Sequence, residues 1–152
     1  GTSVVNMNAA YDALPTAKRT EIENMQTANV RVSSALLKYA NPETLAEQER
    51  LAAPPMMHPL VRTHPDRGTK AIWFHLSKTE KIDGMDAFET QDFLNELLTD
   101  SIKSEFEYTH NWTLGDMLII DNRTAMHKAG VDYDHSQHRM LYRTMVCGDR
   151  PV

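Results

Sequence analysis

Residues 112–127 read WTLGDMLIIDNRTAMH, and this stretch places a turn, an apolar run and a polar loop in direct succession. The Leu-Gly-Asp sequence at 114–116 is typical of a turn. The apolar residues 117–120 predict a short buried strand, and the polar residues after it lead to His127. Short polar loops at strand ends are where antiparallel barrels usually place functional groups. A lone histidine in such a loop is more often a hydrogen-bonded core residue than a metal ligand, so His127 alone does not decide the function.

Residues 139–146, RMLYRTMV, predict the last strand of the chain. Side chains alternate along a strand, so Arg139 and Arg143 share one face. Both faces carry apolar residues, so we expect the strand to be covered on both sides, and a covered guanidinium must be paired. The partner is either Asp121 or Asp116 within the chain, or the carboxylate of a ligand, which suits the planar fork of arginine. Arginines solvated at a sheet edge are the third interpretation.

The upstream residues predict helices first. An apolar repeat from about residue 11 to 30, with Pro15 near its start, is typical of an amphipathic helix. The sequence Asn-Pro-Glu at 41–43 combines an N-cap residue with a proline at the first helical position, which predicts a second helix. The rest of residues 31–57 holds no alternating pattern. We therefore expect a long loop that carries this short helix and serves as a lid.

Strands follow. Residues 60–63 and 71–74 are strand-like runs on either side of a turn-rich connection, which predicts a hairpin. An apolar stripe at helical spacing predicts a third helix after Gly84, and the alternation of residues 106–112 predicts a further strand. This order favours an antiparallel sheet or barrel with helices on one side.

The composition sets limits on the class of protein. The chain has 152 residues, 41% of them hydrophobic and 24% charged, which suits one soluble domain over residues 1–152. The sequence lacks the roughly 18-residue apolar run that a membrane span needs, and a net charge of −5 without a basic run argues against nucleic-acid binding. A single cysteine, Cys147, suits a reducing compartment, so we expect a cytoplasmic protein. The sequence leaves open whether the protein is a homo-oligomer. The opening residues Gly1–Val5 are typical of a strand already under way, which predicts that the domain lacks its N-terminal part.

Several motifs together resemble one known family. Residues 112–127, 137–143 and 148–151 resemble the C-terminal signature of the taurine dioxygenase family, which is roughly W-x-x-G-D-x-x-x-x-D-N-R-x-x-x-H, then R-x-x-x-R and G-D-x-P. Residues 58–65 are similar to its H-P-x-V-R-x-H-P hairpin, and the first fourteen residues are similar to its G-x-T segment and A-A-Y-x-x-L helix start. The resemblance covers nearly the whole chain. It implies a mainly β fold with flanking helices, the double-stranded β-helix or jelly roll, incomplete at its N-terminus.

The resemblance also implies an activity and a set of site residues. It implies an iron(II)- and 2-oxoglutarate-dependent dioxygenase that hydroxylates a small anionic substrate, such as an alkylsulfonate, an alkyl sulfate or an aryloxyalkanoate, with release of succinate and CO2. His127 is the implied iron ligand, Arg139 the implied partner of the 2-oxoglutarate C5 carboxylate, and Thr2 the implied hydroxyl donor to 2-oxoglutarate. Arg143 matches a position that often binds an anionic substrate, so the implied partners are this small molecule and dioxygen.

The family's other two iron ligands form an H-x-D pair that precedes the segment matching Gly1. The sequence contains one such string, at residues 64–66, but Pro65 and the turn composition around it disfavour two ligands on one strand face. We therefore interpret residues 64–66 as a turn, and we expect the chain by itself to be inactive. Two other interpretations stay open: a non-catalytic jelly-roll module that binds a dicarboxylate, and a truncated, inactive dioxygenase.

Overall fold

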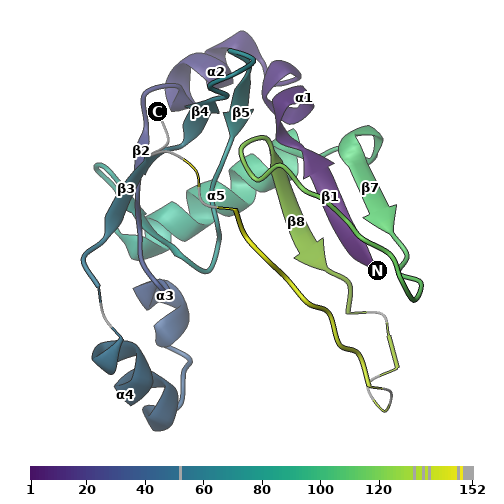
Figure 1. Ribbon diagram of the computed structural model, residues 1–152. Helices are drawn as coiled ribbons and strands as arrows, with labels where there is room; N and C mark the ends of the chain where they lie inside the picture. Colours follow the sequence, from purple (N-terminus) through teal and green to yellow (C-terminus); the bar gives the residue numbers. More distant parts are fainter. Residues whose placement is uncertain (52, 132, 135, 137, 147, 149–152) are drawn as a thin grey trace.

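The computed structural model describes residues 1–51, 53–131, 133–134, 136, 138–146 and 148 (Figure 1). In chain order, its strands and helices are β1 (Thr2–Asn6), α1 (Met7–Asp12), α2 (Thr16–Ile22), β2 (Gln26–Asn29), α3 (Ser34–Leu37), α4 (Pro42–Arg50), β3 (Met56–Pro59), β4 (Val61–Thr63), β5 (Lys70–Ile72), β6 (Thr79–Ile82), α5 (Ala87–Ser101), a 3-10 turn (Ser104–Phe106), β7 (Glu107–His110) and β8 (Ala125–Ala129).

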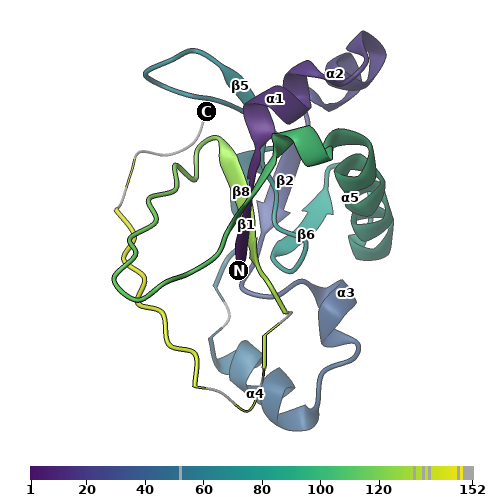
Figure 2. The ribbon, with the colours of Figure 1, turned by 90° about the vertical axis from the view of Figure 1, so that its right-hand side faces the viewer.

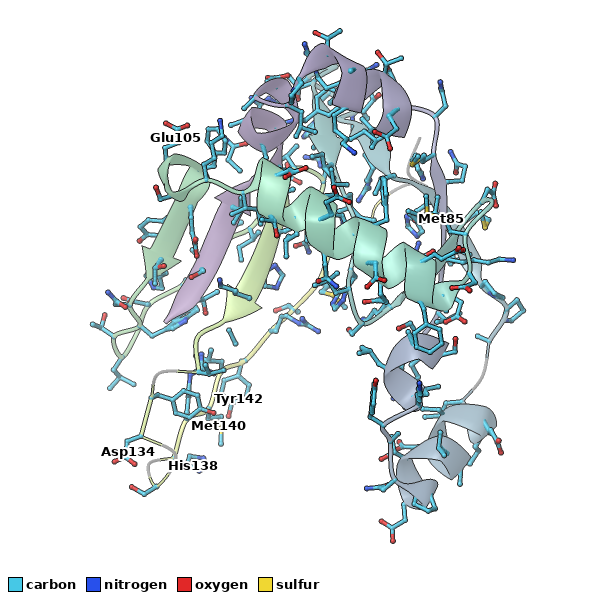
Figure 3. The ribbon with its side chains drawn as sticks, turned by 180° about the vertical axis from the view of Figure 1, so that it is seen from behind. Met85, Glu105, Asp134, His138, Met140 and Tyr142 are labelled. Carbon is cyan, nitrogen blue, oxygen red and sulfur yellow. The ribbon has the colours of Figure 1, made fainter. Side chains whose placement is uncertain are left out.

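The strands form small antiparallel sheets. One sheet has the order β7-β1-β8, a second has the order β3-β2-β6, and β4 pairs with β5 in a hairpin. Figures 1 and 3 show α5 running across the molecule from one three-stranded sheet toward the other. Figure 2 shows α3 and α4 at one end of the molecule, where α3 contacts α5. The core therefore lies where α5, the hairpin and the inner face of β1 meet. Its fully buried members include Met7, Ile22, Leu60, Ile72, Ile82, Leu94 and Leu97.

The long helix α5 confirms the prediction from its apolar stripe. Asp86 caps the helix by accepting hydrogen bonds from the backbone N–H groups of Phe88 and Glu89, at 2.8 and 2.9 Å, and Glu89 accepts from the Asp86 N–H in return. Leu94 and Leu97 on its inner face are buried. The predicted hairpin is also confirmed as β4 and β5, and its turn contains Gly68 at a φ of +65°, which glycine adopts without strain.

The predicted helix over residues 11–30 is wrong in its second half. The chain forms α1 and α2, with Pro15 at the N-cap of α2 as its position indicated, but residues 26–29 form β2 instead. β2 is the middle strand of its sheet, so its backbone is paired on both sides, and this pairing outweighs the helical spacing of the apolar residues. In residues 31–57 the predicted helix at Pro42 is present, with Asn41 accepting from the Thr44 N–H at 2.8 Å, and a second helix, α3, precedes it.

Two predicted strands are also wrong. Residues 117–120 form no strand, and Met117 and Ile119 are 85% and 86% exposed rather than buried. Residues 139–146 are likewise exposed and unpaired with any described strand. An apolar run becomes a strand only where a neighbouring strand supplies its hydrogen bonds, and the described residues supply none to either run. For this reason the described part of the chain forms separate small sheets, and the predicted jelly-roll barrel does not close in it.

Candidate functional site

One face of the β7-β1-β8 sheet gathers residues that carry chemistry. Val4 of β1 pairs with His127 of β8 and with Tyr108 of β7, while Thr2 pairs with Ala129 and His110. Directly paired residues of an antiparallel sheet point to the same side. Thr2 and His127 are therefore diagonal neighbours on one face, a separation of roughly 7–8 Å. The opposite face carries Val5, which is buried in the core.

His127 is exposed on this face, and a second histidine lies near it. His75 follows β5, and its pKa is lowered mainly by partial burial, with smaller electrostatic contributions from the neighbouring Lys78 and His127. The Oγ and N–H of Ser77 contact His75 Nδ1 at 3.0 and 3.3 Å. The N–H leaves Nδ1 as an acceptor, so His75 is neutral with its proton on Nε2.

Thr2 is held by the loop that follows β7. Trp112 Nε1 donates a hydrogen bond to Thr2 Oγ1 at 2.8 Å. The ring of His110 stands nearly perpendicular to the Trp112 ring, with centroids 4.7 Å apart. His110 Nε2 in turn lies 3.1 Å from Asp116 Oδ2. Asp116 also accepts from the N–H and hydroxyl of Thr113, and these bonds, the backbone one first, lower the pKa of its carboxyl group.

The loop before β8 is fixed by a second network, which joins it to the β4–β5 hairpin. Asp121 accepts from the backbone N–H, Nε and Nη2 of Arg123 at 2.9–3.0 Å. It also lies 3.1 Å from Nε2 of His64, whose Nδ1 accepts from two backbone N–H groups in the hairpin turn. His64 is 3% exposed, and Arg123 reaches on to Asp66 at 2.8 Å. The bonds from Arg123, and then the one from His64, hold the pKa of Asp121 far below its usual range.

The arginines of the C-terminal segment lie apart from both networks. Arg139 and Arg143 are exposed, and the Arg139 guanidinium lies 5.3 Å from the centre of the Tyr133 ring. Arg143 has no ion-pair partner among the described residues, because the carboxylate of Asp121 is bound by Arg123 and that of Asp116 by His110. Of the alternatives that the sequence left open for Arg143, the internal ion pair with Asp121 or Asp116 is thus not formed among the described residues. Figure 3 shows His138, Met140 and Tyr142 at the end of this segment that lies away from α5 in that view.

A cleft lies on the site face of the sheet. Its volume is about 390 Å³, and Val4, Asn6 and Tyr108 line it on the sheet side. Residues 118–121 form the opposite wall. The chain that leads into the Asp121 loop thus lies next to Val4, Asn6 and Tyr108, whereas Thr2 and His127 are not among the residues that line the cleft.

Comparison with known proteins identifies the family. The model of the family described as "Taurine catabolism dioxygenase TauD, TfdA family" matches residues 1–145. The chain belongs to this family.

Members of the TauD, TfdA family resemble the chain over nearly its whole length. An alpha-ketoglutarate-dependent 2,4-dichlorophenoxyacetate dioxygenase of Cupriavidus pinatubonensis is 34% identical over 99% of the chain and 51% of its own length. An (S)-phenoxypropionate/alpha-ketoglutarate-dioxygenase of Sphingobium herbicidovorans is 27% identical over 97% of the chain and 52% of its own length. The chain therefore spans about half the length of the curated relatives it matches.

Solved structures give the same result. The crystal structure of AAD-2 in complex with Mn(II) and N-oxalylglycine matches 90% of the chain and 52% of its own chain, with a TM-score of 0.73 and 31% identity. A taurine dioxygenase from Burkholderia xenovorans shares the fold, with a TM-score of 0.61, over 83% of this chain and 39% of its own, at 23% identity. The arrangement of the described sheets and helices is thus that of the corresponding part of a TauD-like dioxygenase.

The residues present do not by themselves make the metal site of the TauD, TfdA family. The described ranges contain no group of three or more His, Cys, Asp or Glu side chains that could hold a metal ion. His64 and Asp66 are confirmed as turn residues, and both ring nitrogens of His64 are engaged in hydrogen bonds. His127, the residue for which the family resemblance implies a metal contact, is an exposed imidazole, and one such side chain does not by itself complete a site. No described helix is long and apolar enough to cross a membrane.

Several residues that shape this site receive no role from the sequence alone. Trp112 is a letter of the matched motif without an assigned contact, and the sequence offers Asp116 and Asp121 only as possible partners of the arginines, not with the contacts that they make here. His110 receives no role from the sequence. A local signal that could have indicated them is the position of polar side chains next to a glycine turn, here the turn at Gly115 with a φ of +95°. Two of their partners are far away in sequence, 110 residues for Trp112 and Thr2 and 57 for Asp121 and His64, so no local pattern contains these two pairs. Asp116, by contrast, binds Thr113 and His110 within its own loop and the strand before it.

Proposed function

We propose that this chain is part of an iron(II)- and 2-oxoglutarate-dependent dioxygenase that hydroxylates a small anionic organic compound and releases succinate and CO2. The observation that supports it best is the placement of Thr2 and His127 as diagonal neighbours on one sheet face. The family implies a co-substrate contact at the first and a metal contact at the second. A carboxylate bound by Thr2 would then lie within reach of a metal bound by His127.

In this proposal each site residue has one role. His127 supplies one nitrogen ligand to iron, and Thr2 donates its hydroxyl proton to 2-oxoglutarate. Arg139 pairs with the C5 carboxylate of 2-oxoglutarate, and Arg143 binds the anionic group of the substrate. Both arginines are exposed and form no ion pair among the described residues, so both can accept an anion. Iron held with the help of His127 would supply the activation of dioxygen, and the chain's own residues would position the two anions.

The class of substrate follows from the relatives. The relatives are named for 2,4-dichlorophenoxyacetate, for (S)-phenoxypropionate and, in an alkylsulfatase of Acinetobacter baylyi at 28% identity, for an alkyl sulfate. All three are anions at neutral pH, which suits a guanidinium at position 143. We propose α3 and α4, within residues 31–57, as the lid over this substrate. The single cysteine supports a reducing compartment, the cytoplasm, as its location.

Succinate formation tests the proposal. The gene product that carries this chain should convert 2-oxoglutarate to succinate in the presence of iron(II), ascorbate and an aryloxyalkanoate or alkyl sulfate. His127→Ala should abolish turnover, whereas His138→Ala, which removes an exposed histidine of the C-terminal segment, should not. Absence of succinate from the unaltered protein with every anion tested would overturn the dioxygenase function. Binding of 2-oxoglutarate without succinate would favour the non-catalytic dicarboxylate module instead.

The two arginines provide an internal comparison. Arg139→Ala should raise the KM for 2-oxoglutarate more than the KM for the substrate, and Arg143→Ala should do the reverse. An unchanged substrate KM in Arg143→Ala would mean that the substrate is held without this guanidinium. For residues 1–152 expressed alone, we expect weak metal binding and no turnover, because the described residues contain no group of three or more side chains that could hold a metal ion.

A further inference from the structure

The hydrogen bond between Trp112 and Thr2 has a fixed direction. An indole N–H can only donate, so at 2.8 Å the Thr2 oxygen must be the acceptor. A hydroxyl group has two lone pairs and one proton, and this bond uses a lone pair. The Thr2 proton is therefore left for another acceptor, and it cannot point along the direction that the indole occupies. Among the described residues no other side chain hydrogen-bonds the Thr2 hydroxyl.

The indole is itself held in place. The perpendicular ring of His110, 4.7 Å away, limits its rotation. His110 is fixed at both nitrogens: Nε2 lies 3.1 Å from Asp116, and Nδ1 lies 3.2 Å from the Tyr108 hydroxyl. The lowered pKa of Asp116 keeps its carboxylate ionised, so it acts as the acceptor and His110 Nε2 carries the proton.

All of these contacts come from one short loop and the strand before it. Gly115 makes the turn at a φ of +95°, and the turn brings Asp116 back to Thr113 and His110. The residues of the W-x-x-G-D motif therefore hold one another in place next to Thr2. Trp112, the first of them, is half-buried, and Thr2, which is 8% exposed, lies on the neighbouring strand β1.

We propose that Trp112 is a positioning residue for the co-substrate. It sets the direction in which the Thr2 hydroxyl donates, so that the Thr2 proton meets a carboxylate oxygen of 2-oxoglutarate on the face that carries His127. His110 and Asp116 hold the indole in the required orientation. The inference rests on the proposed function, because it needs a carboxylate ligand at this face.

Binding of the co-substrate tests the inference. Trp112→Phe keeps an aromatic ring and removes only the donor, so the affinity of the Mn(II)-loaded gene product for N-oxalylglycine should fall about three- to tenfold, the worth of one hydrogen bond. The chain contains a second tryptophan, Trp73, which stacks on His58 at 4.8 Å, so Trp73→Phe is the matched control and should bind normally. An affinity in Trp112→Phe equal to that of the unaltered protein would overturn the inference.

Two further measurements separate positioning from simple support of the loop. In a Thr2→Val background, Trp112→Phe should cause no additional loss of N-oxalylglycine affinity, because the hydroxyl that it directs is gone. An equal loss in both backgrounds would show a purely structural role. In a ¹⁵N-labelled sample without ligand, Thr2→Val should move the indole N–H resonance of Trp112 and leave that of Trp73 in place. Failure of the unaltered protein to bind N-oxalylglycine would count against the proposed function, whereas normal binding by Trp112→Phe counts only against this inference.

Discussion

Replacing Asp121 by alanine should lower the free energy of unfolding by about 2–3 kcal/mol, most of it through His64. The Asp121 carboxylate is the acceptor for His64 Nε2 at 3.1 Å, and the His64 side chain is 2% exposed. The substitution therefore leaves a buried donor without a partner. Such a group costs about 1–3 kcal/mol.

The other bonds of Asp121 should contribute less. Arg123 is 43% exposed and Asp121 is 40% exposed, so water screens their ion pair, and such pairs are worth about 0–1 kcal/mol. Asp66 contacts the same Arg123 guanidinium at 2.8 Å but is 72% exposed. Asp66→Ala is therefore the matched control, with an expected loss of at most about 1 kcal/mol.

Urea unfolding at pH 7, followed by circular dichroism and extrapolated linearly, measures both variants. A double-mutant cycle with His64→Phe then isolates the buried bond. In the His64→Phe background, Asp121→Ala should cost no more than about 1 kcal/mol, because only the exposed bonds to Arg123 are left to lose. Equal costs for Asp121→Ala and Asp66→Ala, or no coupling between positions 64 and 121, would refute this reasoning.

Three other perturbations have defined outcomes. The pKa of Asp121 is lower in the folded chain than its ordinary value of about 3.9, so the unfolded state binds the proton more readily. The difference in unfolding free energy between the unaltered chain and Asp121→Ala should therefore shrink as the pH falls below about 4. Urea unfolding at pH 7 and at pH 3 measures this difference. Asp86→Ala removes the cap of α5 and should cost about 1 kcal/mol, whereas an unchanged urea midpoint would mean that the capping box contributes nothing. Leu94→Ala removes a fully buried core side chain and should cost about 2–5 kcal/mol in the same assay; a loss below that of Asp86→Ala would contradict the position of α5 in the core.

The sequence predicted those parts of the fold that short-range chemistry controls. The helix α5 has its capping box and its apolar stripe within one segment, and the β4–β5 hairpin has its turn residues between its strands. Strand β2 was missed because its apolar residues also suit a helix, and only its partners β3 and β6 decide between the two. For residues 117–120 and 139–146 the error was the reverse: strands were predicted where none forms. Both runs have the composition of strands, but no described strand pairs with them.

The same distinction applies to the site. Motif resemblance indicated Thr2 and His127 individually, but their shared face depends on the register between β1 and β8, which no local pattern contains. The contacts of Trp112 with Thr2 and of His64 with Asp121 likewise join distant segments. The pairing of Arg143 with Asp121 was plausible by charge alone, yet Arg123, two residues away from Asp121, is a nearer partner.

The position of β1 has a consequence for the way the domain folds. β1 is the middle strand of its sheet, but both of its neighbours come from late in the chain; the Ser3 and Thr109 hydroxyls that bond at 2.9 Å are 106 residues apart. During synthesis, the backbone N–H and C=O groups on both edges of β1 stay unpaired until β7 and β8 have been made. The entropy lost in closing so long a loop makes this sheet a late event in folding. In pulse-labelled hydrogen exchange, the amides of β1 should therefore become protected after those of α5, and the nascent chain is most exposed to misassembly in that interval.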